Sequence, residues 1–255
     1  MEEYFLSVYR EFEPKGKRKI CIQGMPGIAL AGKYAVDYLI KESEAKKIFD
    51  LYFNDLPPQV SVDKGLMQMP SVYLNYSYNS HSGDDLLFLS SDFQPLSHDG
   101  VNSLSSILAE ELRKLGVNLI ISLGASAVNN VVKDPKIYVS ATSSKLLNGT
   151  FTSIDFDLFT DGVITGMNGV LPAIVNQSSG IEGVILLVEA CRYLPYDYRA
   201  ARRILQVIEK SFNLKVDYEE IDGKIRDFDQ SLEKLKLGRE RQKTSGKDEK
   251  TNYIG

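Results

Sequence analysis

Short apolar runs alternate along the chain with longer segments in which apolar residues recur at helical spacing. Strands are predicted for residues 19–23, 85–91, 117–123, 136–141 and 183–190, and three of these runs are almost purely apolar. Residues 72–79 alternate between apolar and polar side chains, which predicts a strand nearer an edge of the sheet. Because strands alternate with helices, we predict a three-layer α/β/α fold with a mostly parallel sheet.

Helices are predicted at residues 27–42, 100–115, 168–179, 197–212 and 217–237. The second has an apolar stripe made of Val101, Leu104, Ile107, Leu108, Leu112 and Leu115. We expect His98 and Asp99 to cap this helix, and Asp197 to cap the fourth.

The last predicted helix carries apolar residues at heptad spacing, namely Ile221, Ile225, Phe228, Leu232 and Leu235. An amphipathic helix packed on its own domain is the favoured interpretation, and a coiled coil between chains is the alternative. Residues 1–237 are predicted to form a single α/β domain ending in this helix. Residues 238–255 are predicted to form a flexible, disordered polar tail, because "RERQKTSGKDEKTN" contains no apolar residue. That tail nevertheless ends in Tyr253, Ile254 and Gly255.

The amino-acid composition indicates a packed globular protein and argues against nucleic acid and membrane as partners. Of the 255 residues, 43% are hydrophobic and 25% are charged, which suits a packed core. The net charge of −4 argues against a nucleic-acid partner, and no apolar run is long enough to cross a membrane. We therefore expect a cytoplasmic protein. Cys21 and Cys191 lie in or beside apolar runs and are predicted to be reduced thiols of the core.

The stretch "GMPGIALAGKY" contains the spacing of a phosphate-binding loop, G-x-x-x-x-G-K, from Gly27 to Lys33. Tyr34 stands where the motif requires Ser or Thr to bind Mg²⁺. The apolar residues between Gly27 and Gly32 are compatible with a helix and are expected to begin it at once. Both observations argue against a nucleotide site.

A structural interpretation of these glycines is favoured. Gly24 and Gly27 would allow a tight turn between strand and helix, and Pro26 would restrict the backbone that enters this turn. Gly32 would let the helix lie close to the sheet. A second copy of the pattern, "GMNGVLPA", contains Gly166 and Gly169. The alternative is that the two turns form a cleft lined with backbone N–H groups, which would make the protein a small-molecule or nucleotide-binding enzyme or sensor.

Other catalytic chemistry is sparse. His81 lies in a polar loop, and Ser126 lies in "LGASA", which lacks the G-x-S-x-G elbow. No Cys/His cluster has the spacing of metal ligands, and the carboxylates form no convincing acid–base pair. We therefore expect no enzyme, no catalytic residue, no metal and no cofactor.

Several segments occur in an order that resembles the proteasome assembly chaperone 2 family, in an archaeal-type form. They are "GMPGIALAGKYAVDYLI", "LPPQV", "SDFQP", "ISLGA", "GVITGMNGVL" and "YLPYDYRAA", and the resemblance runs from about residue 18 to about residue 236. It implies a fold related to nucleoside phosphorylases, without their catalytic residues. It also implies a non-enzymatic homo-oligomer that binds the α-ring of the proteasome core particle and assists its assembly or capping.

In that system some partners dock through their last three residues, which are a hydrophobic residue, a tyrosine and any residue. This C-terminal tail inserts between α subunits. The resemblance therefore implies that Tyr253, Ile254 and Gly255 bind the partner. Here the tyrosine is third from the end rather than penultimate.

Overall fold

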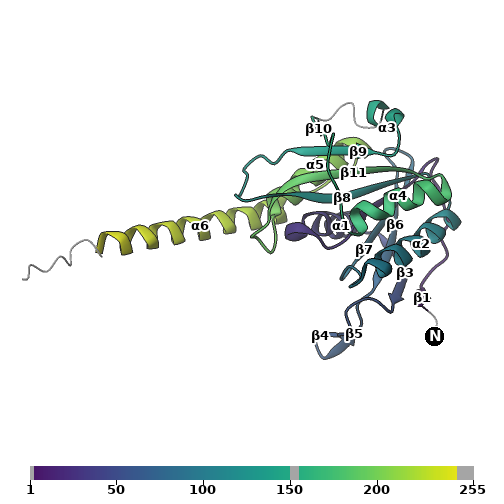
Figure 1. Cartoon of the computed structure of the whole chain (residues 1–255), viewed down its shortest axis with the longest axis horizontal. Helices are drawn as coiled ribbons and strands as arrows, with labels where there is room; N and C mark the ends of the chain where they lie inside the picture. Colours follow the sequence, from purple (N-terminus) through teal and green to yellow (C-terminus); the bar gives the residue numbers. More distant parts are fainter. Residues whose placement is uncertain (1–2, 150–154, 246–255) are drawn as a thin grey trace, which may run out of the picture. The chain divides into compact units, whose positions relative to one another are not determined.

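One large sheet organises the chain. The computed structural model describes residues 3–149 and 155–245, and within them nine strands pair in the order β1-β3-β6-β7-β2-β8-β11-β9-β10. In that order the strands are Tyr4–Val8, Lys46–Phe53, Val72–Asn79, Asp84–Ser91, Lys19–Gly24, Leu119–Val128, Glu182–Cys191, Ile137–Ala141 and Asp157–Leu158 (Figure 1). Strands from distant parts of the sequence are therefore neighbours.

The strands at the centre of the sheet, β7, β2, β8 and β11, are parallel to one another. Towards one edge β6, β3 and β1 are added antiparallel, and towards the other β9 is antiparallel to β11 and β10 parallel to β9. The predicted α/β fold with parallel strands is thus confirmed. The strands β1 and β3 were not predicted, and they place β6 inside the sheet rather than at its margin.

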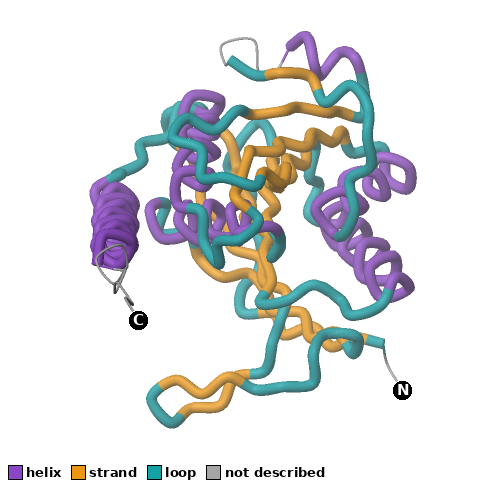
Figure 2. Tube along the Cα trace, turned by 60° about the vertical axis from the view of Figure 1, so that its left-hand side comes forward, coloured by secondary structure: helices purple, strands orange, loops and turns teal. Residues whose placement is uncertain are grey.

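Helices cover both faces of the sheet (Figure 2). The helix α1 (Ala31–Glu42) packs with α5 (Tyr198–Phe212), and α2 (His98–Lys114) packs with α4 (Met167–Ser179). Leu104, Leu108 and Leu112 of the predicted apolar stripe are buried in the core. Cys21 and Cys191 are also buried, and both are free thiols, as predicted.

Side-chain caps decide where two of these helices begin. The Ser97 hydroxyl accepts a hydrogen bond from the Gly100 N–H at 2.9 Å, so Ser97 caps α2. The prediction that His98 and Asp99 cap it is wrong, because both already lie in the first turn. Asp197 caps α5 as predicted, accepting from the Ala200 N–H at 3.1 Å.

Several short elements, among them the two-residue strand β10, were not predicted from the sequence. The helix α3 spans Ser144–Gly149, and the strands β4 (Ser61–Asp63) and β5 (Leu66–Gln68) form a hairpin separate from the main sheet (Figure 1). No helix of the described residues is both long and apolar enough to cross a membrane.

The chain divides into two compact units, Met1–Val216 and Asp217–Gly255. The second contains α6 (Glu219–Ser245), which extends beyond the predicted end at residue 237 and includes the five heptad positions. Acidic residues in its first turn, Glu219, Glu220 and Asp222, suit the positive end of the helix dipole. The residues predicted to bind a partner, Tyr253, Ile254 and Gly255, lie outside the described residues.

An ion pair fastens the start of β2 to β7. Arg18 donates hydrogen bonds of 2.8 Å and 2.6 Å to the two carboxylate oxygens of Asp84, whose side chain is 2% exposed. Burial alone would raise the pKa of Asp84, but the hydrogen bonds and the charge of Arg18 outweigh it and hold this pKa below its ordinary value. The ionised form of Asp84 therefore stabilises the fold.

We expect Asp84→Asn to lower the free energy of unfolding by about 1–3 kcal/mol at pH 7, because the buried carboxylate loses its charge-assisted hydrogen bonds to Arg18. The folded-state pKa is lowered, so this stabilisation is complete above the unfolded pKa of 3.8 and is lost as the pH falls through the folded value. Urea unfolding at pH 7 and at a series of pH values below 4 measures it. The exposed Asp134→Asn is the matched control, and a difference that persisted unchanged into strong acid would contradict the assignment.

Candidate functional site

The side chain of Asn168 joins the two glycine-containing turns, residues 24–33 near the start of the chain and residues 166–169. The Asn168 amide oxygen accepts a hydrogen bond from the Met25 N–H at 2.8 Å, and its NH₂ group donates to the Met25 carbonyl at 3.1 Å. Both residues are buried, with Asn168 7% exposed and Met25 1% exposed. Asn168 therefore pairs with the end of β2 as the backbone of a neighbouring strand would.

Two glutamines complete this junction. The Gln23 amide donates to the Asn168 amide oxygen at 3.1 Å. The Gln94 oxygen accepts from the Met167 N–H at 2.8 Å, and its NH₂ group donates to the Pro26 carbonyl. Gln94 thus clamps the second turn to the first. Sequence reasoning missed Gln23, Gln94 and Asn168 as a set, because no local pattern relates residues so far apart along the chain.

The hydrogen bonds of the turns bear on the hypothesis of an anion-binding cleft. Such a cleft needs several backbone N–H groups directed at a ligand. Here the N–H groups of Met25 and Met167 are bonded to side chains, while those of Leu30 and Gly169 donate to the carbonyls of their own turns at 3.1 Å and 3.0 Å. These donors are engaged within the protein, so the geometry favours packing of the two turns over ligand binding.

Close backbone contact explains two of the glycines. A Cβ atom on Gly32 would lie 2.0 Å from the Leu123 carbonyl oxygen of β8, and one on Gly24 would lie 2.4 Å from the Gly32 carbonyl oxygen. The start of α1 therefore rests directly on the sheet. Gly27 differs, because its backbone is extended (φ −154°) and an added Cβ would make only a 3.4 Å contact with Asn168.

The second turn has its own steric demands. Gly166 has a φ of 75°, in the left-handed region that favours glycine, and a Cβ there would lie 2.6 Å from the Gln94 oxygen. A Cβ on Gly169 would lie 2.7 Å from the Ile164 carbonyl oxygen. The two copies of the sequence pattern therefore serve related steric purposes.

The expectation that a helix begins directly after Gly27 is wrong. Ile28–Leu30 form a single 3₁₀ turn in which Ala29 and Leu30 both have a φ of 49°, and α1 starts at Ala31. Residues with a Cβ are strained in this region. The Ala29 carbonyl accepts from the Asp197 N–H at 3.0 Å, so the α5 cap holds the strained turn in place.

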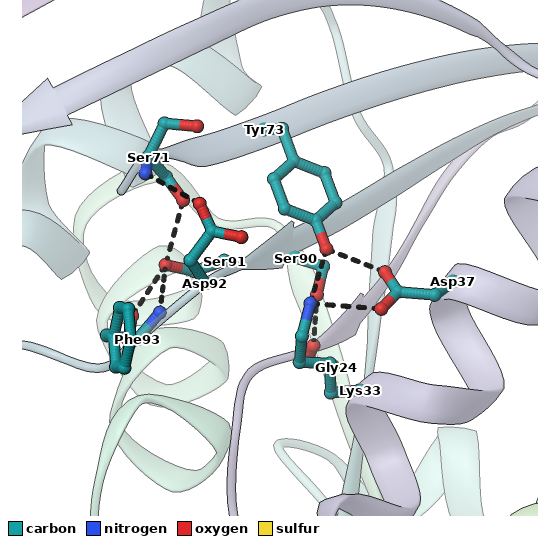
Figure 3. A network of polar contacts seen from close by, with 9 residues as sticks. All are labelled: Gly24, Lys33, Asp37, Ser71, Tyr73, Ser90, Ser91, Asp92 and Phe93. Atoms are coloured by element: carbon teal, nitrogen blue, oxygen red, sulfur yellow. Dashed lines mark hydrogen bonds and ion pairs between the residues drawn. The ribbon is translucent and has the colours of Figure 1, made fainter. Parts of the chain in front are cut away.

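Lys33, the lysine of the phosphate-loop pattern, is directed to other partners (Figure 3). Its ammonium donates to the Tyr73 hydroxyl at 2.5 Å and pairs with Asp37 at 2.9 Å, and the Tyr73 hydroxyl donates to Asp37 at 2.6 Å. Burial, together with the charge and hydrogen bond of Asp37, raises the pKa of Tyr73. Lys33 is therefore one member of a closed triad that ties α1 to β6.

The residues considered for catalysis are not brought together. His98 begins α2, while His81 follows β6, where its N–H donates to the Asn79 side chain at 3.1 Å. Within the described residues, no three His, Cys, Asp or Glu side chains are placed to hold a metal ion.

The sequence model of the PAC2 family matches residues 21–236. This chain belongs to the PAC2 family. The uncharacterized protein MJ1210 of Methanocaldococcus jannaschii is 29% identical to this PAC2 chain, over 96% of the chain and 95% of its own length. The resemblance noted in the sequence is therefore confirmed at the level of the family.

Solved structures of PAC2-like proteins share the fold. Pyrococcus furiosus PbaB, described as an archaeal proteasome activator, superimposes with a TM-score of 0.84 at 25% identity, covering 92% of this chain and 100% of its own. P. furiosus PbaA, described as an archaeal homolog of proteasome-assembly chaperone, gives a TM-score of 0.76 at 22% identity, covering 96% and 97%. The Mycobacterium tuberculosis proteasome-assembly chaperone homologue Rv2125 gives 0.67 at 15% identity, covering 85% and 94%. The likeness to PbaA and Rv2125 concerns the fold alone.

Gly32 and Gly27 of this PAC2 protein differ in the space available to an added Cβ atom, so alanine variants at the two positions form a matched pair. Gly32→Ala should lower the free energy of unfolding by about 3 kcal/mol or prevent folding, because the Leu123 carbonyl must move. Gly27→Ala should change it by less than about 1 kcal/mol, because the backbone is extended and the site has room. Urea unfolding of both variants is the measurement. Equal tolerance at the two positions would refute the packing argument, as would a stabilisation by nucleotide that Gly27→Ala removes.

Proposed function

We propose that this protein is a non-enzymatic binding partner of the proteasome core particle that acts as a homo-oligomer on the α-ring. The observation that carries the proposal is the similarity to the archaeal proteasome activator PbaB over nearly the whole of both chains. Membership of the PAC2 family supports the same role. The occupied backbone donors of the glycine turns weigh against the alternative of a nucleotide-binding enzyme or sensor at residues 24–33 and 166–169.

Exposed apolar side chains on the hairpin support a role in protein binding. They are Val60, Val62, Leu66, Met67 and Met69, with exposed fractions between 52% and 77%. Apolar side chains gathered on one surface element often mark a protein–protein contact. A two-stranded hairpin is marginally stable by itself, so a partner that covered these side chains would also stabilise the hairpin.

Purified α-rings provide the direct test of the proposal. Sedimentation of the protein with rings made of recombinant α subunits should show a complex, and peptidase assays of assembled core particles should separate activation from assistance in assembly. An increased peptidase rate supports an activator, and faster assembly from subunits supports a chaperone. Absence of any complex at micromolar concentrations would refute the proposal.

We further propose that the terminal residues Tyr253, Ile254 and Gly255 contact the α subunits. A tyrosine supplies an apolar ring and a hydroxyl, which suits a pocket between subunits. Deletion of residues 252–255 should weaken binding to α-rings about tenfold, because burial of one ring less the cost of ordering the segment leaves about 1–2 kcal/mol. Tyr253→Ala should reproduce the loss and Tyr253→Phe should retain most of the binding. Unchanged affinity after the deletion would show that the segment takes no part.

We propose that Phe228 and Leu232, heptad positions of α6, lie between subunits of the homo-oligomer, whereas Ile221, the first heptad position, is already buried within its own chain. Introducing charge with Phe228→Glu and Leu232→Glu should then yield a folded but smaller species, because two carboxylates cannot be buried in an apolar seam without a large desolvation cost. Light scattering gives the mass and circular dichroism the fold. Gln230→Glu with Ser231→Glu adds the same charge at exposed positions and is the control. An unmodified protein that is monomeric at micromolar concentration would contradict the proposal, as would misfolding of the double variant.

A further inference from the structure

The outer strands β1, β3 and β6 have two chemically different faces. Side chains on one face, including Leu51, Val72 and Leu74, enter the core beside α2. The alternate side chains line an open groove of about 1080 Å³, and they are Phe5, Ser7 and Tyr9 of β1 and its extension, Asp50 and Tyr52 of β3, and Tyr73 and Asn75 of β6. Asp37 and Ile40 of α1, together with Met67, Gln68 and Met69 at the hairpin, also line it.

Lys47, which lines this groove, and Lys33, which contacts its lining residues Asp37 and Tyr73, both have carboxylate partners. Lys47 pairs with Asp50 at 2.9 Å, and its ammonium lies 5.7 Å from the ring centres of Tyr9 and Tyr73. The Tyr9 hydroxyl donates to Asp50 at 2.9 Å, and this hydrogen bond to a carboxylate raises the pKa of Tyr9 to about 12. Lys33 is paired with Asp37, as described above. These pairs leave the groove with no unpaired positive charge among its described residues.

Two acceptors in the groove remain available. The Asp92 carboxylate, at the end of β7, accepts from the Ser71 N–H at 2.9 Å and has no cationic partner in the described part of the chain. Asn75 is 7% exposed, and its amide oxygen is buried without a hydrogen-bond partner among the described residues. An unsatisfied buried acceptor costs about 1–3 kcal/mol, which a ligand N–H group would recover.

The two acceptors are separated along the direction of β6. Asp92 is bonded to Ser71, which directly precedes β6, and Asn75 lies within β6. Ser71 and Asn75 are four residues apart, which corresponds to about 13 Å along a strand. A single ammonium or guanidinium group cannot reach both. Two basic side chains on the same face of an extended peptide, four residues apart, have the same spacing.

We propose that this groove binds an extended peptide segment of a partner protein that carries two basic side chains about four residues apart. One guanidinium or ammonium would pair with Asp92, and the other would donate an N–H group to the Asn75 oxygen. The aromatic and methionine side chains that line the groove suit the aliphatic stems of such basic side chains.

The proposal does not depend on the proteasome as the partner, and its test uses the full chain alone. A peptide with an N-terminal dye, fluorescein-Ala-Arg-Ala-Ala-Ala-Arg-Ala-amide, is titrated with protein, and fluorescence anisotropy reports binding. We expect binding that weakens as salt increases. The same peptide with citrulline in place of both arginines keeps its N–H groups but loses its charge, and it should bind at least threefold more weakly. No binding of the arginine peptide, or equal binding of both peptides, would overturn the proposal.

Variants localise the binding to the groove. Asn75→Leu should weaken it about tenfold, because a buried hydrogen bond to a charged group is lost. Asp92→Asn should weaken it about three- to fivefold, because Asp92 is exposed and its ion pair is screened. Asn102→Leu and Asp134→Asn, at exposed positions elsewhere, should have no effect. Since Asp92 lies at the surface, its variant keeps the test valid even if Asn75→Leu fails to fold.

Competition distinguishes a peptide from a free cation. Unlabelled arginine peptide should displace the probe at concentrations at least tenfold lower than arginine amide or spermidine, because only the peptide spans both acceptors. Equal competition by the small cations would mean that the groove holds a single amine, and it would overturn the proposal of a peptide. Unchanged binding to both Asn75→Leu and Asp92→Asn would place the peptide elsewhere and would also overturn it.

Discussion

The side-chain amide of Asn168 substitutes for a strand at the point where β2 ends. By bonding to both the N–H and the carbonyl of Met25, it satisfies a buried backbone that would otherwise lack partners. Gln23 and Gln94 extend the network on either side, and buried networks of this kind are costly to leave incomplete. The position of α1 depends on this junction, since the turn that leads into α1 starts from Met25.

The position of α1 in turn determines which of its side chains contact β6. Because Gly24 and Gly32 let this helix rest on β2 and β8, its exposed side carries Lys33 and Asp37 to Tyr73 on β6. A lysine that a phosphate-binding loop would direct at a ligand instead fastens a helix to the sheet. The same spacing of glycines and lysine can therefore arise from packing, and the side chains that surround it decide which role it has.

Two of the proposed binding surfaces, the hairpin and the groove, lie outside the parallel centre of the sheet. The apolar hairpin β4–β5 and the groove on β1, β3 and β6 belong to antiparallel additions at one side of the sheet. The parallel strands are buried between helices and present little surface to a partner. An antiparallel strand can keep one face in the core and leave the other open, which is why the groove lies there.

The sequence by itself determined the parallel centre, the four helices that cover it, the Asp197 cap and the burial of both cysteines, because each depends on periodicity or chemistry within a few residues. It also indicated the family, through the order of several short segments. Only the tertiary structure decided the role of Asn168, whose partner lies 143 residues away. It likewise decided the left-handed turn before α1 and the strand β3, whose apolar run is interrupted by Asp50. The Asp50 carboxylate also accepts from the Tyr9 hydroxyl, which reaches it only when β1 pairs with β3, and no local pattern encodes such a neighbour.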